Sequence, residues 1–193
     1  AIAIAIVLGA RKGWPRESMR PHSVPFVILG AGILWFGWFG FNAGSALAAN
    51  ETSAFAFVNT NIAGAAGLLG WMGWERYKNG HPTTLGAASG AIAGLVAITP
   101  SCGFISPMAS AFVGVAAGIV CASAITLKHR VKIDDSLDVF GVHLVAGVLG
   151  TIFIGFVSIN SYNHSATKGL LTGGGAALLE HQLIAVIAVI AYA

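Results

Sequence analysis

Runs of about 20 apolar residues, separated by short polar segments, constrain this chain more than any other feature. Only 9% of its 193 residues are charged, whereas soluble domains carry about 25% charged residues. A soluble globule with so few charges would have an apolar surface and would aggregate. In a lipid bilayer, apolar side chains can face outward. The sequence therefore predicts an all-α integral membrane protein that forms a multi-span helical bundle.

The apolar windows predict five complete spans and a partial span at each end. The chain opens and closes inside apolar runs and has no signal-peptide pattern, so we expect it to be truncated at both ends. We expect residues 1–193 to form one membrane domain. The expected partial spans are 1–9 and a segment from near 181, and the complete spans are 26–48, 53–74, 84–100, 107–127 and 139–158.

The basic residues lie almost entirely on one side of the expected membrane. If successive loops alternate sides, nine of the ten Lys and Arg residues fall in one set of loops, and only Lys168 falls in the other. This asymmetry predicts that the basic set faces the cytoplasm. We expect no nucleic-acid binding, because the basic residues form short clusters rather than one continuous face. The nine residues are Arg11, Lys12, Arg16, Arg20, Arg76, Lys78, Lys128, Arg130 and Lys132.

His143 is the most informative single residue because it lies inside an apolar span. An ionisable side chain at such a position is energetically costly and is a candidate functional residue. The neutral ring can both donate and accept a hydrogen bond, so it could hold a polar substrate or relay a proton. Its position is equally compatible with a buried histidine that bonds to a neighbouring helix.

The aromatic segment at residues 35–45 is the second signal. Trp38, Phe41 and Ser45 are spaced three and four residues apart, so they share one helix face. Aromatic faces attract cations by ~0.5–2 kcal/mol each, and the Ser45 hydroxyl adds an acceptor near the outer end of the span. The face could therefore receive a small cation from outside. An aromatic belt at the membrane interface is the alternative interpretation.

The remaining polar residues favour structural roles. The acidic run at 134–138 precedes the span that carries His143, and there we favour helix capping over a catalytic carboxylate pair. Cys102 and Cys121 should be free thiols, separated by roughly 20 Å along a helix. Metal-binding spacings such as HExxH and CxxC are absent from the sequence, and no second catalytic group lies near His143 or Ser45. We therefore expect no cofactor and no enzymatic activity.

Small residues repeat every four positions in three of the expected helices, and this spacing lets helix backbones approach closely. The repeats are Gly40 and Gly44; Gly86, Gly90 and Gly94; and Gly114 and Gly118.

Four motifs carry a resemblance that extends over the whole chain. They are Pro21-His22-Ser23-Val24-Pro25, the segment 36–45 (FGWFGFNAGS), the segment 94–100 (GLVAITP) and the segment 134–143 (DDSLDVFGVH). In order, spacing and sidedness, these motifs resemble the ammonium transporter, methylammonium permease and Rhesus (Amt/Mep/Rh) family, and the Amt branch in particular. The resemblance implies an eleven-helix fold, of which this chain would cover roughly the end of helix 5 to the start of helix 11.

The resemblance also implies a role for individual residues. Phe41 matches the inner-lying member of a phenylalanine gate, and Ser45 matches the hydroxyl of an outer ammonium site. His143 matches the second member of a histidine pair. The matching pore-lining positions are Leu34, Trp38, Thr99 and Val139. The first histidine, the other gate phenylalanine, the recruiting tryptophan and a supporting aspartate would belong to helices outside this chain.

The expected function is therefore transmembrane transport of ammonium or ammonia, with methylammonium as an analogue. The resemblance implies a homotrimer in the cell membrane, with a pore in each protomer and a possible regulatory signal protein on the cytoplasmic side. Two alternatives stay open: an ammonium sensor on the same fold, and a secondary transporter of another small polar substrate.

Overall fold

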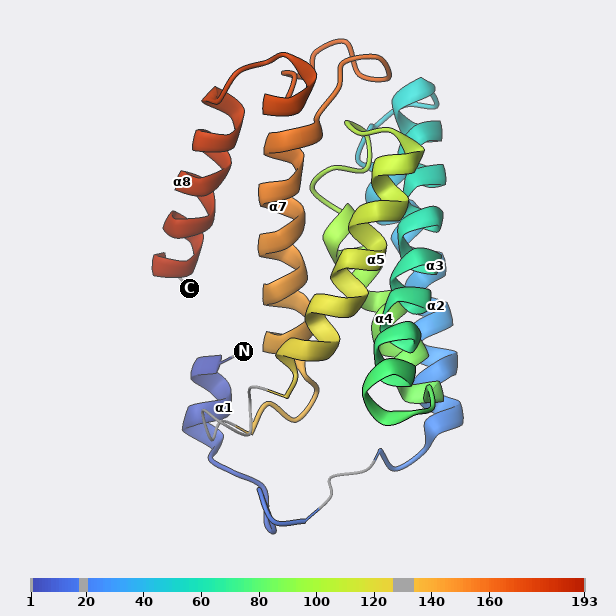
Figure 1. Cartoon of the computed structure of the whole chain (residues 1–193), viewed down its shortest axis with the longest axis vertical. Helices are drawn as coiled ribbons and strands as arrows, with labels where there is room; N and C mark the ends of the chain where they lie inside the picture. The colour runs from blue at the N-terminus through green and yellow to red at the C-terminus, as the bar shows by residue number, and fades with distance from the viewer. Residues whose placement is uncertain (1, 18–20, 127–133, 193) are drawn as a thin grey trace.

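The computed structural model describes residues 2–17, 21–126 and 134–192. Long helices run side by side in a bundle, with α8 at one edge and the short α1 below α7 (Figure 1). The elements are α1 (Ile2–Leu8), α2 (Val24–Gly44), α3 (Glu51–Asn79), α4 (Thr84–Ile98), α5 (Pro107–Ala124), the π-helical turn η1 (Phe140–Leu144), α7 (Val145–Val157), the 3-10 turn η2 (Leu170–Thr172) and α8 (Ala177–Tyr192).

Each expected span contains a helix, which confirms the helical membrane fold. Within the described residues, three helical segments are long and apolar enough to cross a membrane by composition alone: Val24–Gly44, Pro107–Ala124 and Phe140–Val157. The helices in the expected spans 53–74 and 84–100 fall short of that test. The first, α3, has 29 residues but contains buried polar side chains, and the second, α4, has only 15 residues.

Local sequence signals set the ends of α3. Asn50 and Ser53 form a reciprocal capping box, in which the Asn50 side chain accepts from the Ser53 amide at 3.0 Å and the Ser53 hydroxyl accepts from the Asn50 amide at 3.0 Å. At the other end, Gly80 adopts a left-handed conformation with φ of 81°, which favours glycine. These two caps set the first and last residues of α3.

Glycines let α4 and α5 approach the backbone of α3 closely. A Cβ atom at Gly94 would collide with the carbonyl of Ala63, and one at Gly118 would collide with the carbonyl of Gly67. The predicted close packing is therefore confirmed at these two helices. At Gly40 and Gly44 in α2, an added Cβ would meet none of the described residues within 4 Å, so the prediction stays untested there.

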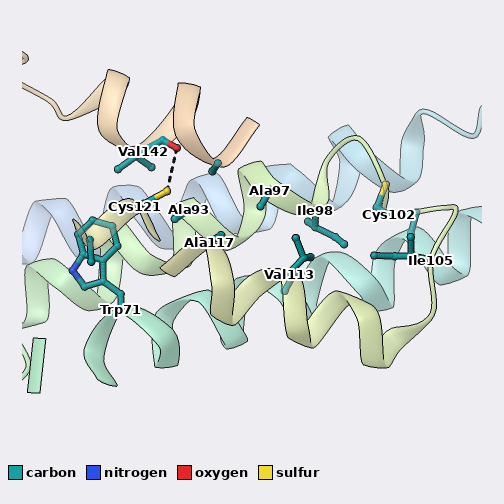
Figure 2. Packing of buried hydrophobic residues seen from close by; sticks show 14 residues of the cluster. Trp71, Ala93, Ala97, Ile98, Cys102, Ile105, Val113, Ala117, Cys121 and Val142 are labelled. Carbon is teal, nitrogen blue, oxygen red and sulfur yellow. Dashed lines mark hydrogen bonds between the residues drawn. The ribbon is translucent and has the colours of Figure 1, made fainter. Parts of the chain in front are cut away.

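Small apolar side chains from α3, α4, α5 and α7 fill the core between the helices. Figure 2 shows this packing, with the Cys121 thiol directed at the backbone carbonyl of Val142, at a sulfur–oxygen distance of 3.7 Å. The core consists of Ala56, Ala63, Trp71, Ala93, Ala97, Ile98, Cys102, Ile105, Val113, Ala117, Cys121, Ala122, Val142 and Ala146.

The described loops gather at the two ends of the bundle in the expected sets, while Arg20, Lys128, Arg130 and Lys132 lie outside the described residues. At one end, the Ile159 amide donates to the Phe104 carbonyl at 2.7 Å, and the Thr52 hydroxyl donates to the Tyr162 carbonyl at 2.8 Å. At the other end, Arg11 forms an ion pair with Asp134. The loops near Asn50, Ser101 and 159–169 therefore share one end, as the alternation of basic residues predicts.

Candidate functional site

A tryptophan with a fixed orientation lies near the end of α4. Trp38 Nε1 donates to Thr99 Oγ1 at 2.9 Å, and Thr99 Oγ1 donates in turn to the Leu95 carbonyl at 2.8 Å. The Trp38 and Phe41 rings meet edge to face, with centroids 6.2 Å apart. Because the indole is held by both contacts, the two rings present fixed faces rather than mobile ones.

A cavity of about 210 Å³ lies beside the Phe41 ring, and Phe41, Ser45 and Thr99 contribute to its wall. Trp38 does not line it, but contacts two of these wall residues, Phe41 and Thr99. The Ser45 hydroxyl donates to the Phe41 carbonyl at 2.6 Å. A hydroxyl has one hydrogen and two lone pairs, so this bond leaves the Ser45 oxygen able to accept from a ligand. We call this space the outer cavity. Its other lining residues are Asn42, Ala46, Thr52, Ala56, Cys102, Gly103, Phe104 and Asn163.

Buried polar side chains behind the outer cavity hold its walls in place. Asn42 Nδ2 donates to Thr60 Oγ1 at 3.0 Å, and this bond joins α2 to α3. Asn59 Nδ2 donates to the carbonyls of Cys102 and Ile105 at 2.7 and 2.8 Å, which fixes the loop after α4. Our sequence analysis missed these residues. The sequence could have indicated them, because Asn and Thr side chains inside an apolar span need a polar partner.

His143 lies in the π-helical turn η1 and lines a second cavity of about 280 Å³ between α7 and α8. Gly147 and Thr151 line the same cavity one and two helical turns further on. Among the described residues, none forms a hydrogen bond with the His143 ring. The ring can therefore bond to a group inside this cavity.

The other two predicted pore-lining residues lie elsewhere. Val139 lines a third cavity, of about 340 Å³, together with residues of α1 and the segment after it. The Leu34 side chain is 54% exposed on α2 and lines none of these three cavities. The structure thus brings Trp38, Phe41, Ser45 and Thr99 together, and it leaves Leu34, Val139 and His143 at separate positions.

Comparison with known proteins decides the family. The model of the "Ammonium Transporter Family" matches residues 1–193, which is the whole chain. The chain belongs to the ammonium transporter family. It is 52% identical over 198 residues to an ammonium transporter of Mycobacterium tuberculosis (strain H37Rv), and this match covers 100% of the chain and 41% of the relative.

Solved structures of ammonium transporters and their relatives have the same fold. The crystal structure of Candida albicans Mep2 matches with a TM-score of 0.90 and 35% identity, covering 98% of this chain and 44% of that one. A structure titled "Sensor Amt Protein" matches with a TM-score of 0.84 and 30% identity, covering 97% and 46%. The chain thus spans less than half the length of these ammonium transporter relatives.

Two structural predictions for this chain are confirmed. Asp135 caps the start of the helix that carries His143, because its carboxylate accepts from the amides of Val139 and Phe140 at 3.0 and 2.7 Å. Cys102 and Cys121 are both free and buried. Burial raises the pKa of the Cys102 thiol to about 11, so it is neutral at physiological pH.

Proposed function

We propose that the full-length protein transports ammonium across the cell membrane. The outer cavity carries this proposal, because in a chain of the ammonium transporter family it places the Phe41 ring beside the free lone pairs of Ser45. No enzymatic step is included in the proposal.

The outer cavity has the chemistry to receive a small cation with N–H donors. Bare ammonium loses its water on entering an apolar pathway, which costs several kcal/mol. The aromatic faces of Trp38 and Phe41 replace part of that hydration at ~0.5–2 kcal/mol each. The Ser45 oxygen accepts a hydrogen bond from one N–H of the ion. Because the Ser45 hydroxyl donates its own hydrogen to the Phe41 carbonyl, the lone pairs of the Ser45 oxygen stay available.

Passage through the apolar segment requires the ion to give up its charge. Ammonium can donate a proton to the neutral His143 ring, which becomes charged and passes the proton on to the other member of the histidine pair, while the ammonia continues by exchanging hydrogen bonds with the ring. Potassium can neither donate a hydrogen bond nor lose a proton. Selectivity thus comes from proton chemistry rather than from pore diameter. Leu34, Thr99 and Val139 are proposed to line the same pathway.

The proposed pathway is completed by segments outside this chain. The Phe41 side chain is 60% exposed, and the His143 cavity opens beside α8. A partner histidine and a second gate aromatic would cover these faces in the full-length protein. We further propose that the protein is a homotrimer with one pore in each protomer, and that a regulatory signal protein binds at its cytoplasmic side.

A sensor on the same fold is the second candidate function. It is favoured by the similarity to the structure titled "Sensor Amt Protein". A sensor would bind ammonium at the outer cavity with little flux, whereas a transporter would move methylammonium across the membrane.

Uptake kinetics of the Ser45→Ala variant test the outer site. Loss of the acceptor should raise the KM for methylammonium about tenfold, equivalent to ~1.4 kcal/mol for a hydrogen bond to a charged group, with a smaller change in maximal rate. Ser161→Ala, at an exposed outer-loop serine, is the control and should leave KM unchanged. An unchanged KM for Ser45→Ala would contradict the assignment, and the absence of uptake by the unsubstituted protein would favour the sensor.

A further inference from the structure

An ion pair joins two loops at the basic end of the bundle, 123 residues apart in sequence. Asp134 Oδ2 accepts from the backbone amide of Arg11 at 2.9 Å and from its Nε at 2.8 Å, and Asp134 Oδ1 accepts from Arg11 Nη2 at 2.6 Å. The Asp134 side chain is only 2% exposed, while that of Arg11 is 39% exposed. A carboxylate bound at both oxygens by a planar guanidinium has a fixed geometry, unlike an ordinary exposed ion pair.

The next residue, Asp135, bonds to the helix that carries His143. Its two carboxylate oxygens cap the amides of Val139 and Phe140. Between Asp135 and Val139, the residue Asp138 has a φ of 54°, a left-handed conformation that costs energy for a residue other than glycine. The Asp138 carbonyl accepts from the Val142 amide at 2.8 Å. The strained turn is therefore held by hydrogen bonds on both sides.

The segment that follows this turn is π-helical rather than α-helical. The Val145 amide bonds to the Phe140 carbonyl five residues earlier, so the turn contains an extra residue. On its inner side, an added Cβ at Gly141 would meet Ile125, the residue at the end of α5, at 2.7 Å. Because one side is packed and the start is capped, the direction of His143 depends on how the turn at 134–138 is held.

We infer that Arg11 is a positioning residue for His143, acting through Asp134, Asp135 and the π-helical turn η1. The inference rests on the proposed transport function. Arg11, Asp134, Asp135 and Val139 also line one cavity, so the ion pair lies beside a second proposed pathway residue. The planar guanidinium of Arg11 bonds to both oxygens of Asp134 in a fixed geometry that a lysine ammonium cannot provide. Positive charge alone therefore does not reproduce the role of Arg11.

The first test measures methylammonium uptake per folded trimer in the full-length protein. Arg11→Gln should lower uptake about tenfold, because small misplacements of a reacting group carry large kinetic costs. Uptake by the Arg11→Lys variant should lie between that of Arg11→Gln and that of the unsubstituted protein. Adding Arg11→Gln to Asp134→Asn should cause little further loss beyond that of Asp134→Asn alone, because Arg11 acts through Asp134. Arg16→Gln, at an exposed arginine of the same loop, is the matched control.

Normalisation to folded trimer separates positioning from stability. If Arg11→Gln lowers the amount of trimer while uptake per trimer stays normal, Arg11 only stabilises the fold and the inference is wrong. Additive losses in the double variant would contradict it as well. No uptake by the unsubstituted protein would instead contradict the proposed transport function.

A cryo-electron microscopy structure of the Arg11→Lys trimer provides a readout that does not depend on activity. The inference predicts a rotated His143 ring or a rewound turn at Phe140–Leu144, with α3, α4 and α5 unchanged. An unaltered turn and ring would overturn it. This variant keeps the positive charge, so it should remain foldable where the Gln variant does not.

Discussion

At the scale of single residues, the candidate site depends on hydroxyl groups with a defined hydrogen-bond direction. Ser45 donates to the Phe41 carbonyl, and Thr99 donates to the Leu95 carbonyl while it accepts from Trp38. Each hydroxyl therefore uses its hydrogen on the backbone and directs acceptor capacity away from it. This arrangement suits a cation that has hydrogens to donate.

Cys102 offers a test of the buried wall of the outer cavity. Its thiol should react slowly with iodoacetamide at pH 7, because burial raises its pKa to about 11 and the thiolate is the reactive form. Below that pKa the thiolate fraction grows about tenfold per pH unit, so the rate should still be rising at pH 10. A variant with Cys102 as its single cysteine provides the measurement. A rate that levels off near pH 8.5 would show an ordinary, exposed thiol.

At the scale of elements, helix number and position could be predicted from apolar windows, because each window needs about 20 residues to cross hydrocarbon. The capping role of Asp135 could also be predicted, since carboxylates before a helix satisfy free amides. The π-helical turn at His143 could not, because it depends on the packing of Gly141 against Ile125, which no local pattern encodes.

The glycine repeats show the same limit. Spacing alone does not distinguish Gly94, which contacts the backbone of α3, from Gly40, where an added Cβ would meet none of the described residues within 4 Å. Both fit the small-residue pattern, but only a tertiary contact gives the pattern its effect.

Gly94→Ala should destabilise the bundle, because its Cβ would collide with the Ala63 carbonyl of α3. Overpacking of this kind costs about 1–3 kcal/mol. The matched control is Gly73→Ala, where an added Cβ meets nothing within 4 Å. Thermal unfolding of the purified protein in detergent should show a lower melting temperature for Gly94→Ala alone. Equal melting temperatures for the two variants would contradict the packing described here.

At the scale of the whole molecule, the chain forms a well-packed bundle that covers less than half the length of its relatives. Its core lies among α3, α4, α5 and α7, while the faces that carry Leu34 and Phe41 are exposed. Hydrogen bonds from the buried Asn59 and Asn42 side chains hold the wall behind those faces in place. We therefore expect the second wall of the pathway to come from segments outside this chain.

The most direct test of the proposed function replaces His143 with alanine in the full-length protein. Uptake of methylammonium is measured in a transporter-deficient host, with membrane abundance and oligomeric state determined on the same samples. If His143 hydrogen-bonds to the substrate or accepts its proton, uptake should be abolished or strongly reduced while the trimer assembles nearly normally. A structural histidine would instead cost about 1–3 kcal/mol of stability, so assembled protein and uptake would fall together. Normal uptake by the His143→Ala variant would contradict the account.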